Sequence, residues 1–267
     1  MITTSFALTR WCLQDLGEHW STETICRFAN KMDVSAIEVV APEEFGLLKQ
    51  FGLTCALTTS HQFVRGMNNP LHWDECLGKL RNAIDANAAY SFPNVVTFTG
   101  FANTLGLEKG SFVDHNDGLQ NCIESYKKIV GYAEKNKVTL CLESLNTRDP
   151  LEMLGHPGYQ GDHLDFCLEI IEKVGSPYLK LLFDAYHVQI MDGDLIRRIR
   201  SLGDRIGHVQ IAGVPGRGEP DESQEINYPA VLGTLLEIGY QGHVGLEYIP
   251  TLSTSQSLTH VLEWLRE

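Results

Sequence analysis

The chain has 267 residues, of which 43% are hydrophobic and 21% are charged. This composition is typical of an ordinary globular protein and excludes a disordered or fibrous one. With 34 acidic and 21 basic side chains, the formal net charge is −13. The surface as a whole therefore repels phosphate backbones, and nucleic acid is not an expected partner.

Seven cysteines are spread along the chain, and none forms a Cys-x-x-Cys pair. The odd number and the wide spacing argue against a disulfide framework and against a zinc knuckle. The N-terminus lacks the basic and apolar regions of a signal peptide, and no uninterrupted apolar stretch approaches ~18 residues. We expect a reduced, cytoplasmic protein without a membrane partner, while formation of a homo-oligomer stays open.

Short β-rich runs alternate with amphipathic stretches along the whole chain. This alternation is typical of βαβ units in a parallel sheet. Most of the runs are apolar nearly throughout, as strands covered on both faces must be. They predict eight strands, over residues 5–9, 36–40, 53–60, 94–100, 138–145, 179–185, 206–213 and 243–249.

Between the strands, apolar residues recur at helical spacing, and several segments have aspartate or proline near their start and glycine near their end. They predict helices over 74–90, 119–136, 162–174, 194–202 and 228–239. Eight such units closing on themselves give an α/β fold of the (β/α)8 or TIM-barrel type, with an open doubly wound sheet as the alternative. No linker or shift in composition divides the chain, so residues 1–267 are expected to form a single TIM-barrel domain.

The two longest segments without a regular pattern are 100–118 and 146–161. Both follow predicted strands. They are therefore expected at the C-terminal mouth of the barrel, where the active-site loops of this fold lie.

Oxygen-bearing side chains lie at or near the ends of predicted strands five to eight, namely Glu143, Asp184, Gln210 and Glu247. Alternate residues on a barrel strand point inward, and a charged residue there needs a partner. Carboxylates buried close together have strongly raised pKa values unless a cation neutralises them. Oxygen ligands of these types suit Mg²⁺ or Mn²⁺ better than zinc. The pattern predicts a divalent metal at the mouth, although any one residue alone is also compatible with an ion pair or a loop cap.

Two histidines lie close to these positions in the sequence. His187 follows Asp184 by three residues and is expected above strand six, where it binds substrate or relays a proton unless it only packs the loop. His208 precedes Gln210 by two residues and should lie one layer deeper. There, a structural histidine and a functional, substrate-binding one are both open.

Other polar residues are expected at the same end of the barrel. Arg217, in a Gly/Pro-rich segment after strand seven, could clamp a substrate carboxylate, the alternative being a loop salt bridge with Glu219 or Glu222. His61 and Arg65, after strand three, form a second candidate substrate-binding cluster. The four tryptophans are expected to pack in the core or against helices.

Five motifs in the second half of the chain occur in order with family-like spacing: LCLESLN, LLFDAYHVQ, GHVQIAGVPGRGEP, EINYP and GYQGHVGLEYIP. Together they resemble the hydroxypyruvate isomerase branch of the xylose-isomerase-like TIM-barrel superfamily. The resemblance covers about residues 138–250. It implies that Glu143, Asp184, Gln210 and Glu247 bind the metal, and that Glu143 and Glu247 also form the acid/base pair.

The same resemblance implies substrate contacts, because His187 and Arg217 match residues of the related ketose 3-epimerases. Those epimerases usually carry histidine at the position of Gln210, so the glutamine favours the hydroxypyruvate isomerase branch. The chain departs from that branch at Gly218, where a histidine is common, and in segment 61–77. These departures leave room for another substrate of the same reaction class.

The implied reaction is a 1,2-proton shift in a small hydroxy-keto acid or sugar, with hydroxypyruvate and tartronate semialdehyde as the leading pair. The metal would stabilise the enediolate while Glu143 and Glu247 move the proton. The alternatives are a ketose 3-epimerase or a 2-oxo-tetronate isomerase on the same site, an abasic-site endonuclease, and a non-catalytic sugar-binding barrel. The net charge and Gln210 argue against the nuclease.

Overall fold

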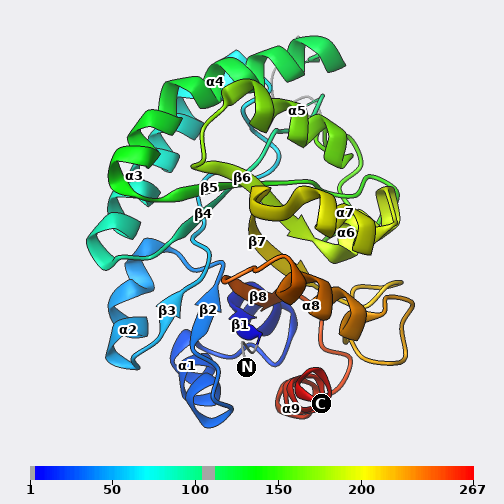
Figure 1. The fold of residues 1–267 in the computed structure, drawn as a ribbon. Helices are drawn as coiled ribbons and strands as arrows, with labels where there is room; N and C mark the ends of the chain where they lie inside the picture. The colour runs from blue at the N-terminus through cyan, green and yellow to red at the C-terminus, as the bar shows by residue number, and fades with distance from the viewer. Residues whose placement is uncertain (1–3, 104–111) are drawn as a thin grey trace.

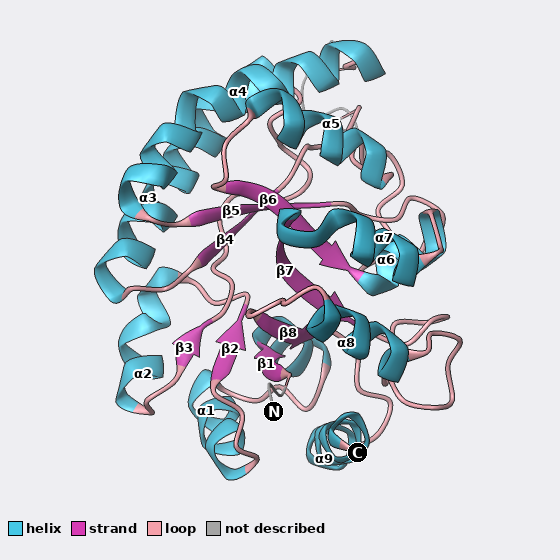
Figure 2. Ribbon diagram, viewed as in Figure 1, coloured by secondary structure: helices cyan, strands magenta, loops and turns pink. Residues whose placement is uncertain are grey.

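The computed structural model describes residues 4–103 and 112–267, so the predicted irregular segment 100–118 lies partly outside the described residues. Parallel strands form one curled sheet in the order β3-β2-β1-β8-β7-β6-β5-β4. Helices surround this sheet (Figures 1 and 2). The first strand pairs with both the second and the last, as in a ring. The predicted (β/α)8 TIM barrel is therefore confirmed, and the open doubly wound alternative is wrong.

The strands begin within one residue of their predicted starts, and all but the first end earlier than predicted. Most of the residues lost from the predicted runs belong to the loops at the mouth of the barrel. The observed strands are β1 (Ser5–Thr9), β2 (Ala36–Glu38), β3 (Thr54–Cys55), β4 (Asn94–Thr97), β5 (Thr139–Glu143), β6 (Leu179–Asp184), β7 (Ile206–Ile211) and β8 (His243–Leu246).

Thr58 joins the two ends of the sheet. Its backbone N–H donates to the carbonyl of Asn94 (2.9 Å), and its carbonyl accepts from the N–H of Val96 (3.0 Å). It also forms a parallel bridge with Val40. The later part of the predicted strand 53–60 thus closes the barrel, although β3 itself is short.

The five helices predicted from the sequence are present, and α1, α2, α6 and α9 are additional. Predicted helix 119–136 begins earlier, because the Asp114 side chain accepts the N–H groups of Asn116 and Asp117 and so caps the helix there. The helices are α1 (Thr22–Lys31), α2 (Phe45–Gln50), α3 (Trp73–Tyr90), α4 (His115–Asn136), α5 (Leu164–Val174), α6 (Ala185–Met191), α7 (Leu195–Leu202), α8 (Tyr228–Glu237) and α9 (Thr254–Arg266). Within the described ranges, none of them has the length and apolar character needed to cross a bilayer.

The interior of the barrel is divided into an apolar and a polar side. Inward-facing residues from the region of β3 to β6 form a small cluster: Leu57, Val96, Cys141 and Leu182. On the side of β1, β2, β7 and β8, the carboxylate of Glu38 accepts hydrogen bonds and is fully buried. Gly245 on β8 leaves space for it, since a Cβ at this glycine would lie 2.2 Å from a carboxylate oxygen of Glu38.

Gly245→Ala should lower the free energy of unfolding by about 1–3 kcal/mol, the usual cost of overpacking a buried site. Denaturant unfolding measures the change. Gly131→Ala is the matched control, because Gly131 is exposed on α4 and its added Cβ meets nothing within 4 Å. That control should stabilise the helix by roughly 0.5–1 kcal/mol. Equal effects of the two substitutions would show that Gly245 is not constrained by Glu38.

Candidate active site

The four predicted metal ligands lie at the C-terminal ends of neighbouring strands. Glu143 is the last residue of β5, Asp184 is the last residue of β6, and Glu247 directly follows β8. Gln210 on β7 pairs in register with Asp184. All four side chains are buried, with 6% or less of each residue exposed.

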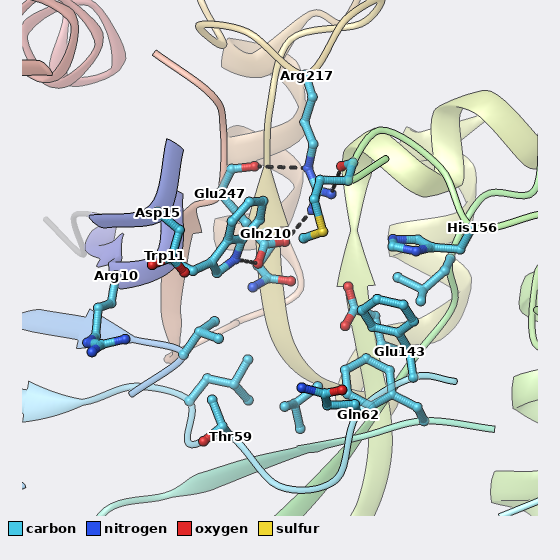
Figure 3. A pocket seen from close by; sticks show the side chains of 17 residues that line it. Arg10, Trp11, Asp15, Thr59, Gln62, Glu143, His156, Gln210, Arg217 and Glu247 are labelled. Atoms are coloured by element: carbon cyan, nitrogen blue, oxygen red, sulfur yellow. Dashed lines mark hydrogen bonds and ion pairs between the residues drawn. The ribbon is translucent and has the colours of Figure 1, made fainter. Parts of the chain in front are cut away.

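A cavity of about 330 Å³ opens beside these strand ends. Figure 3 shows Glu143 and Glu247 on opposite sides of it, with Gln210 and Arg217 on the side of Glu247. One part of the lining is polar and another is aromatic or aliphatic. The lining residues are Arg10, Trp11, Asp15, Val39, Leu57, Thr59, Gln62, Phe63, Val96, Phe98, Glu143, Leu145, Met153, His156, Gln210, Arg217 and Glu247.

The Arg217 guanidinium is the positive charge of this site. Its Nη2 lies 2.6 Å from Oε2 of Glu247 and 3.5 Å from Oδ2 of Asp184. The guanidinium carbon also lies 5.3 Å from the ring centroid of Trp11 and 5.2 Å from that of Tyr186. Arg217 therefore forms two ion pairs and two cation–π contacts. These interactions are buried, and each of them is stronger there than it would be at the surface.

The loop after β7 holds Arg217 in this place through its backbone. Arg217 has a left-handed φ of 57°, and its carbonyl accepts the N–H of Ile249 (2.7 Å). Its Nη1 donates to the carbonyl of Met153 (2.6 Å) in the loop after β5. The proposed loop salt bridge with Glu219 or Glu222 is not formed, because the carboxylate of Glu219 instead accepts hydrogen bonds from Thr251 and Ser257, and Arg217 turns inward.

Burial raises the pKa of the three carboxyl groups at the mouth. For Glu143, desolvation is the main cause, and the charges of Glu247 and Asp184 raise its pKa further. Desolvation also raises the pKa of Asp184, and it raises that of Glu247 to about 8 although Arg217 opposes the shift. Although burial disfavours the charge of Arg217, Glu247 and Asp184 hold the pKa of its guanidinium above the ordinary value. The site is therefore short of positive charge.

The atoms present fit a hard divalent cation. Three carboxylates and one guanidinium leave a formal charge of −2 at the mouth. Among the described residues, the buried Oε1 of Gln210 has no hydrogen-bond partner. One ligand atom each from Glu143, Asp184 and His187 lie within 4.8 Å of one another. Convergence of all four oxygen-bearing side chains on one ion stays a prediction.

His187 points a hydrogen-bond donor into the site. Its Nδ1 lies 3.1 Å from the backbone nitrogen of Asn146 and 2.7 Å from Nδ2 of the same residue, both donors. Nδ1 therefore accepts, and the proton of the neutral ring lies on Nε2, which is 3.5 Å from Oδ2 of Asp184. Desolvation and then Arg217 lower the pKa of His187 well below its usual value, so the ring stays neutral.

The two carboxylate oxygens of Asp184 have different roles, one as a helix cap and one in the site. Oδ1 accepts the N–H of Tyr186 (2.9 Å) and so caps α6, the helix that carries His187. Oδ2 faces Arg217 and His187. The three-residue spacing between Asp184 and His187 thus brings both side chains to the mouth.

The structure does not bring His61, Arg65 and His208 into the cavity lining. His61 is buried, and its Nε2 lies 2.9 Å from Oγ1 of Thr97. Desolvation lowers the pKa of His61 to about 4. Arg65 pairs with Glu75 at the surface (3.2 Å). His208 is fully buried one layer below the mouth.

Among the polar and aromatic residues at or next to the site, sequence reasoning missed the roles of Trp11, His156 and Glu38. Trp11, expected to pack in the core, instead donates its Nε1–H to Oε1 of Glu247 (2.7 Å). His156, from the irregular segment 146–161, projects into the cavity beside Phe63, with 4.4 Å between ring centroids (Figure 3). Glu38 lies beneath Gln210. The available signal for Glu38 was a carboxylate within the apolar run AIEVV.

Comparison with known proteins assigns the chain to a family. A family model described as "Xylose isomerase-like TIM barrel" matches residues 22–267, most of the chain. The chain belongs to the xylose isomerase-like TIM barrel family. The strand-end carboxylates, Gln210 and the loop that carries Arg217 all lie within the matched residues.

Curated relatives match part of the chain. A 2-oxo-tetronate isomerase from Cupriavidus necator is 42% identical over 121 residues, 45% of this chain and 44% of the relative. A hydroxypyruvate isomerase from Escherichia coli is 34% identical over 136 residues, 51% of this chain and 50% of the relative. In these matches the chain spans about half the length of each relative.

A solved structure is similar over nearly the full length. It is titled as an AP endonuclease, family 2, from Brucella melitensis, and it is 27% identical with a TM-score of 0.81. The match covers 99% of this chain and 100% of the other. This similarity agrees with the barrel seen in Figure 1.

Metal affinity should depend on pH because protons and a cation compete for the same carboxylates. The pKa of Glu247 is raised to about 8 without metal, so below that pH a cation must displace a proton. Affinity for Mn²⁺ should therefore increase as the pH rises from about 6 to about 8. Calorimetry in buffers of different ionisation enthalpy measures both affinity and proton release. Affinity that is constant over this range would contradict the proposed ligand role of Glu247.

Proposed function

We propose that this protein is a metal-dependent isomerase of a small 2-oxo acid with an adjacent hydroxyl group, with hydroxypyruvate as the first candidate and a 2-oxo-tetronate as the second. The observation that carries the proposal is the pair Glu143 and Glu247 facing each other across a cavity beside a set of oxygen ligands (Figure 3). The names of the related isomerases from Cupriavidus necator and Escherichia coli support the substrate class.

We further propose Glu143, Asp184, Gln210 and Glu247 as the metal ligands, with Mg²⁺ or Mn²⁺ as the ion. When bound, such a cation supplies a positive charge that stabilises the negative charge developing on the substrate's oxygen atoms. The carboxylate and amide oxygens and the formal charge of −2 favour a hard divalent ion.

The two glutamates are proposed to move the proton between neighbouring carbons. Glu247 is held by Trp11 on Oε1 and by Arg217 on Oε2, which fixes its carboxylate toward the cavity. Burial raises the pKa of Glu143 and Glu247, and a carboxylate with a raised pKa is a stronger base. The neutral ring of His187 would donate its Nε2–H to a substrate oxygen.

Arg217 is the proposed contact for the substrate carboxylate. Of the two arginines that line the cavity, Arg10 pairs with Glu44 (2.7 Å) outside the proposed ligand set. Arg217 lies beside the proposed ligands and within cation–π distance of the Trp11 and Tyr186 rings. Its planar guanidinium suits bidentate binding of a carboxylate.

Glu247→Gln separates the role of ligand from that of proton carrier. The variant keeps an oxygen for the metal, so metal binding should survive in weakened form. Exchange of the substrate's carbon-bound proton into D₂O, followed by NMR with hydroxypyruvate and C4 2-oxo acids, should fall by at least ~10²-fold.

Two other substitutions test whether the loss of proton exchange is specific to Glu247. Glu237→Gln removes an exposed carboxylate paired with Arg200 and should leave exchange unchanged. Gln210→Glu should act mainly on metal affinity or preference, because it touches neither proposed proton carrier. If metal-loaded Glu247→Gln isomerises the substrate at nearly the wild-type rate, Glu247 is a ligand alone.

A nuclease is the second candidate function, because the similar solved structure from Brucella melitensis is titled as an AP endonuclease. The net charge of −13 opposes binding to a phosphate backbone. We expect no detectable binding to duplex DNA at physiological salt and no nicking of abasic DNA after addition of Zn²⁺. Gel-shift and nicking assays test this, and robust metal-dependent nicking would make the nuclease the leading function.

A further inference from the structure

Glu38 is a fully buried carboxylate to which the proposed reaction gives no task. It ends β2, and its side chain points into the barrel toward β1, β7 and β8. Its Oε1 accepts hydrogen bonds from Oγ1 of Thr9 (2.6 Å) and from Nε2 of Gln210 (2.9 Å). Its Oε2 lies 2.5 Å from Nε2 of His208. Three donors therefore hold both oxygens.

This arrangement determines which end of the Gln210 amide faces the mouth. The carboxylate oxygen Oε1 accepts hydrogen bonds, so the Nε2 end of the amide turns toward Glu38. The Oε1 end then turns the other way. There it is buried and has no partner among the described residues. An amide oxygen without a partner is a free ligand for a hard cation.

The surrounding chain is built to admit the Glu38 carboxylate. Thr9 pairs with Glu38 in the register of β1 and β2, and Gln210 pairs with Gly245 in the register of β7 and β8. The missing side chain at Gly245 creates the space, since a Cβ there would lie 2.2 Å from either carboxylate oxygen of Glu38. Residues from four strands thus meet around one buried carboxylate.

We propose that Glu38 is a positioning residue that fixes the Gln210 amide with its oxygen toward the metal, and that His208 and Thr9 hold Glu38 in place. This inference rests on the proposed ligand set. Without the acceptor, the amide of Gln210 can rotate and present its NH₂ group, which repels a cation. Partners of this kind typically change metal affinity by about 10- to 100-fold when they are removed.

Metal affinity of the substrate-free protein tests the proposal directly. Calorimetric titration with Mn²⁺ compares the wild type with Glu38→Leu, which removes both acceptor oxygens and keeps a side chain of similar size. We expect Glu38→Leu to weaken binding by about 10- to 100-fold. Glu44→Gln is the matched control, because it removes the charge of a partly buried carboxylate that contacts Arg10 and Thr22 and does not contact Gln210. It should change affinity by no more than about twofold.

A double-mutant cycle separates positioning from a general effect of charge. In a Gln210→Ala background there is no amide to orient, so Glu38→Leu should change Mn²⁺ affinity by no more than about twofold. A loss of about tenfold or more that persists in that background would show that Glu38 acts through its charge, and would overturn the positioning role.

The other outcomes of the titration distinguish failure of this inference from failure of the proposed ligand set. If the wild type binds neither Mn²⁺ nor Mg²⁺, the proposed ligand set and this inference both fail. If the wild type binds and folded Glu38→Leu binds equally well, the inference alone fails. Should Glu38→Leu not fold, the exchanged pair Glu38→Gln with Gln210→Glu restores the hydrogen bond with an oxygen toward the mouth. Mn²⁺ binding by that variant within about tenfold of the wild type supports the proposal, and loss of binding overturns it.

Discussion

Three carboxylates buried at one end of a barrel need positive charge beside them, and the rest of this site is arranged around that requirement. Glu143, Asp184 and Glu247 come from three strands, and the raised pKa values show how strongly burial disfavours their charges. Arg217 offsets part of the charge through two ion pairs. The remaining charge is what a divalent cation would balance, so electrostatics links the fold to the proposed chemistry.

The barrel meets this requirement because its strand ends carry the carboxylates, while a loop carries the compensating positive charge of Arg217. Strand ends fix Asp184 and Gln210 in neighbouring register positions. The loop after β7 brings Arg217 back over the mouth, where it also binds the carbonyl of Met153 from the loop after β5. A guanidinium that contacts Asp184 at the end of β6, Glu247 just after β8 and Met153 in the loop after β5 couples the position of these loops to the charge state of the carboxylates.

The fold and the strand-end residues could be predicted from the sequence because they depend on local periodicity. Alternation along a strand gives the inward direction of Glu143 or Asp184 without knowledge of any other strand. Partners are different, since they depend on contacts across the barrel. Glu38 and Gln210 are separated by 172 positions, and Trp11 and Glu247 by 236. No pattern within one strand specifies such pairs, which is why Trp11 and Glu38 were missed and Arg217 was given alternative partners.

The same distinction explains the two kinds of histidine near the mouth. His208 lies on the inward face of β7, as its spacing from Gln210 predicted, but only the structure shows that its ring lies against Glu38 beneath the proposed ligands. His187 lies on α6, and the N–H groups of Asn146 fix its tautomer. A cation bound to Asp184 and Glu247 would compete with Arg217 for these carboxylates. The guanidinium would then be free for a substrate carboxylate, while the neutral His187 could donate to a substrate oxygen without adding a charge that opposes the metal. A site for both a divalent ion and an anionic substrate is thus served by a neutral donor, His187, beside a guanidinium, Arg217, that can exchange one carboxylate partner for another.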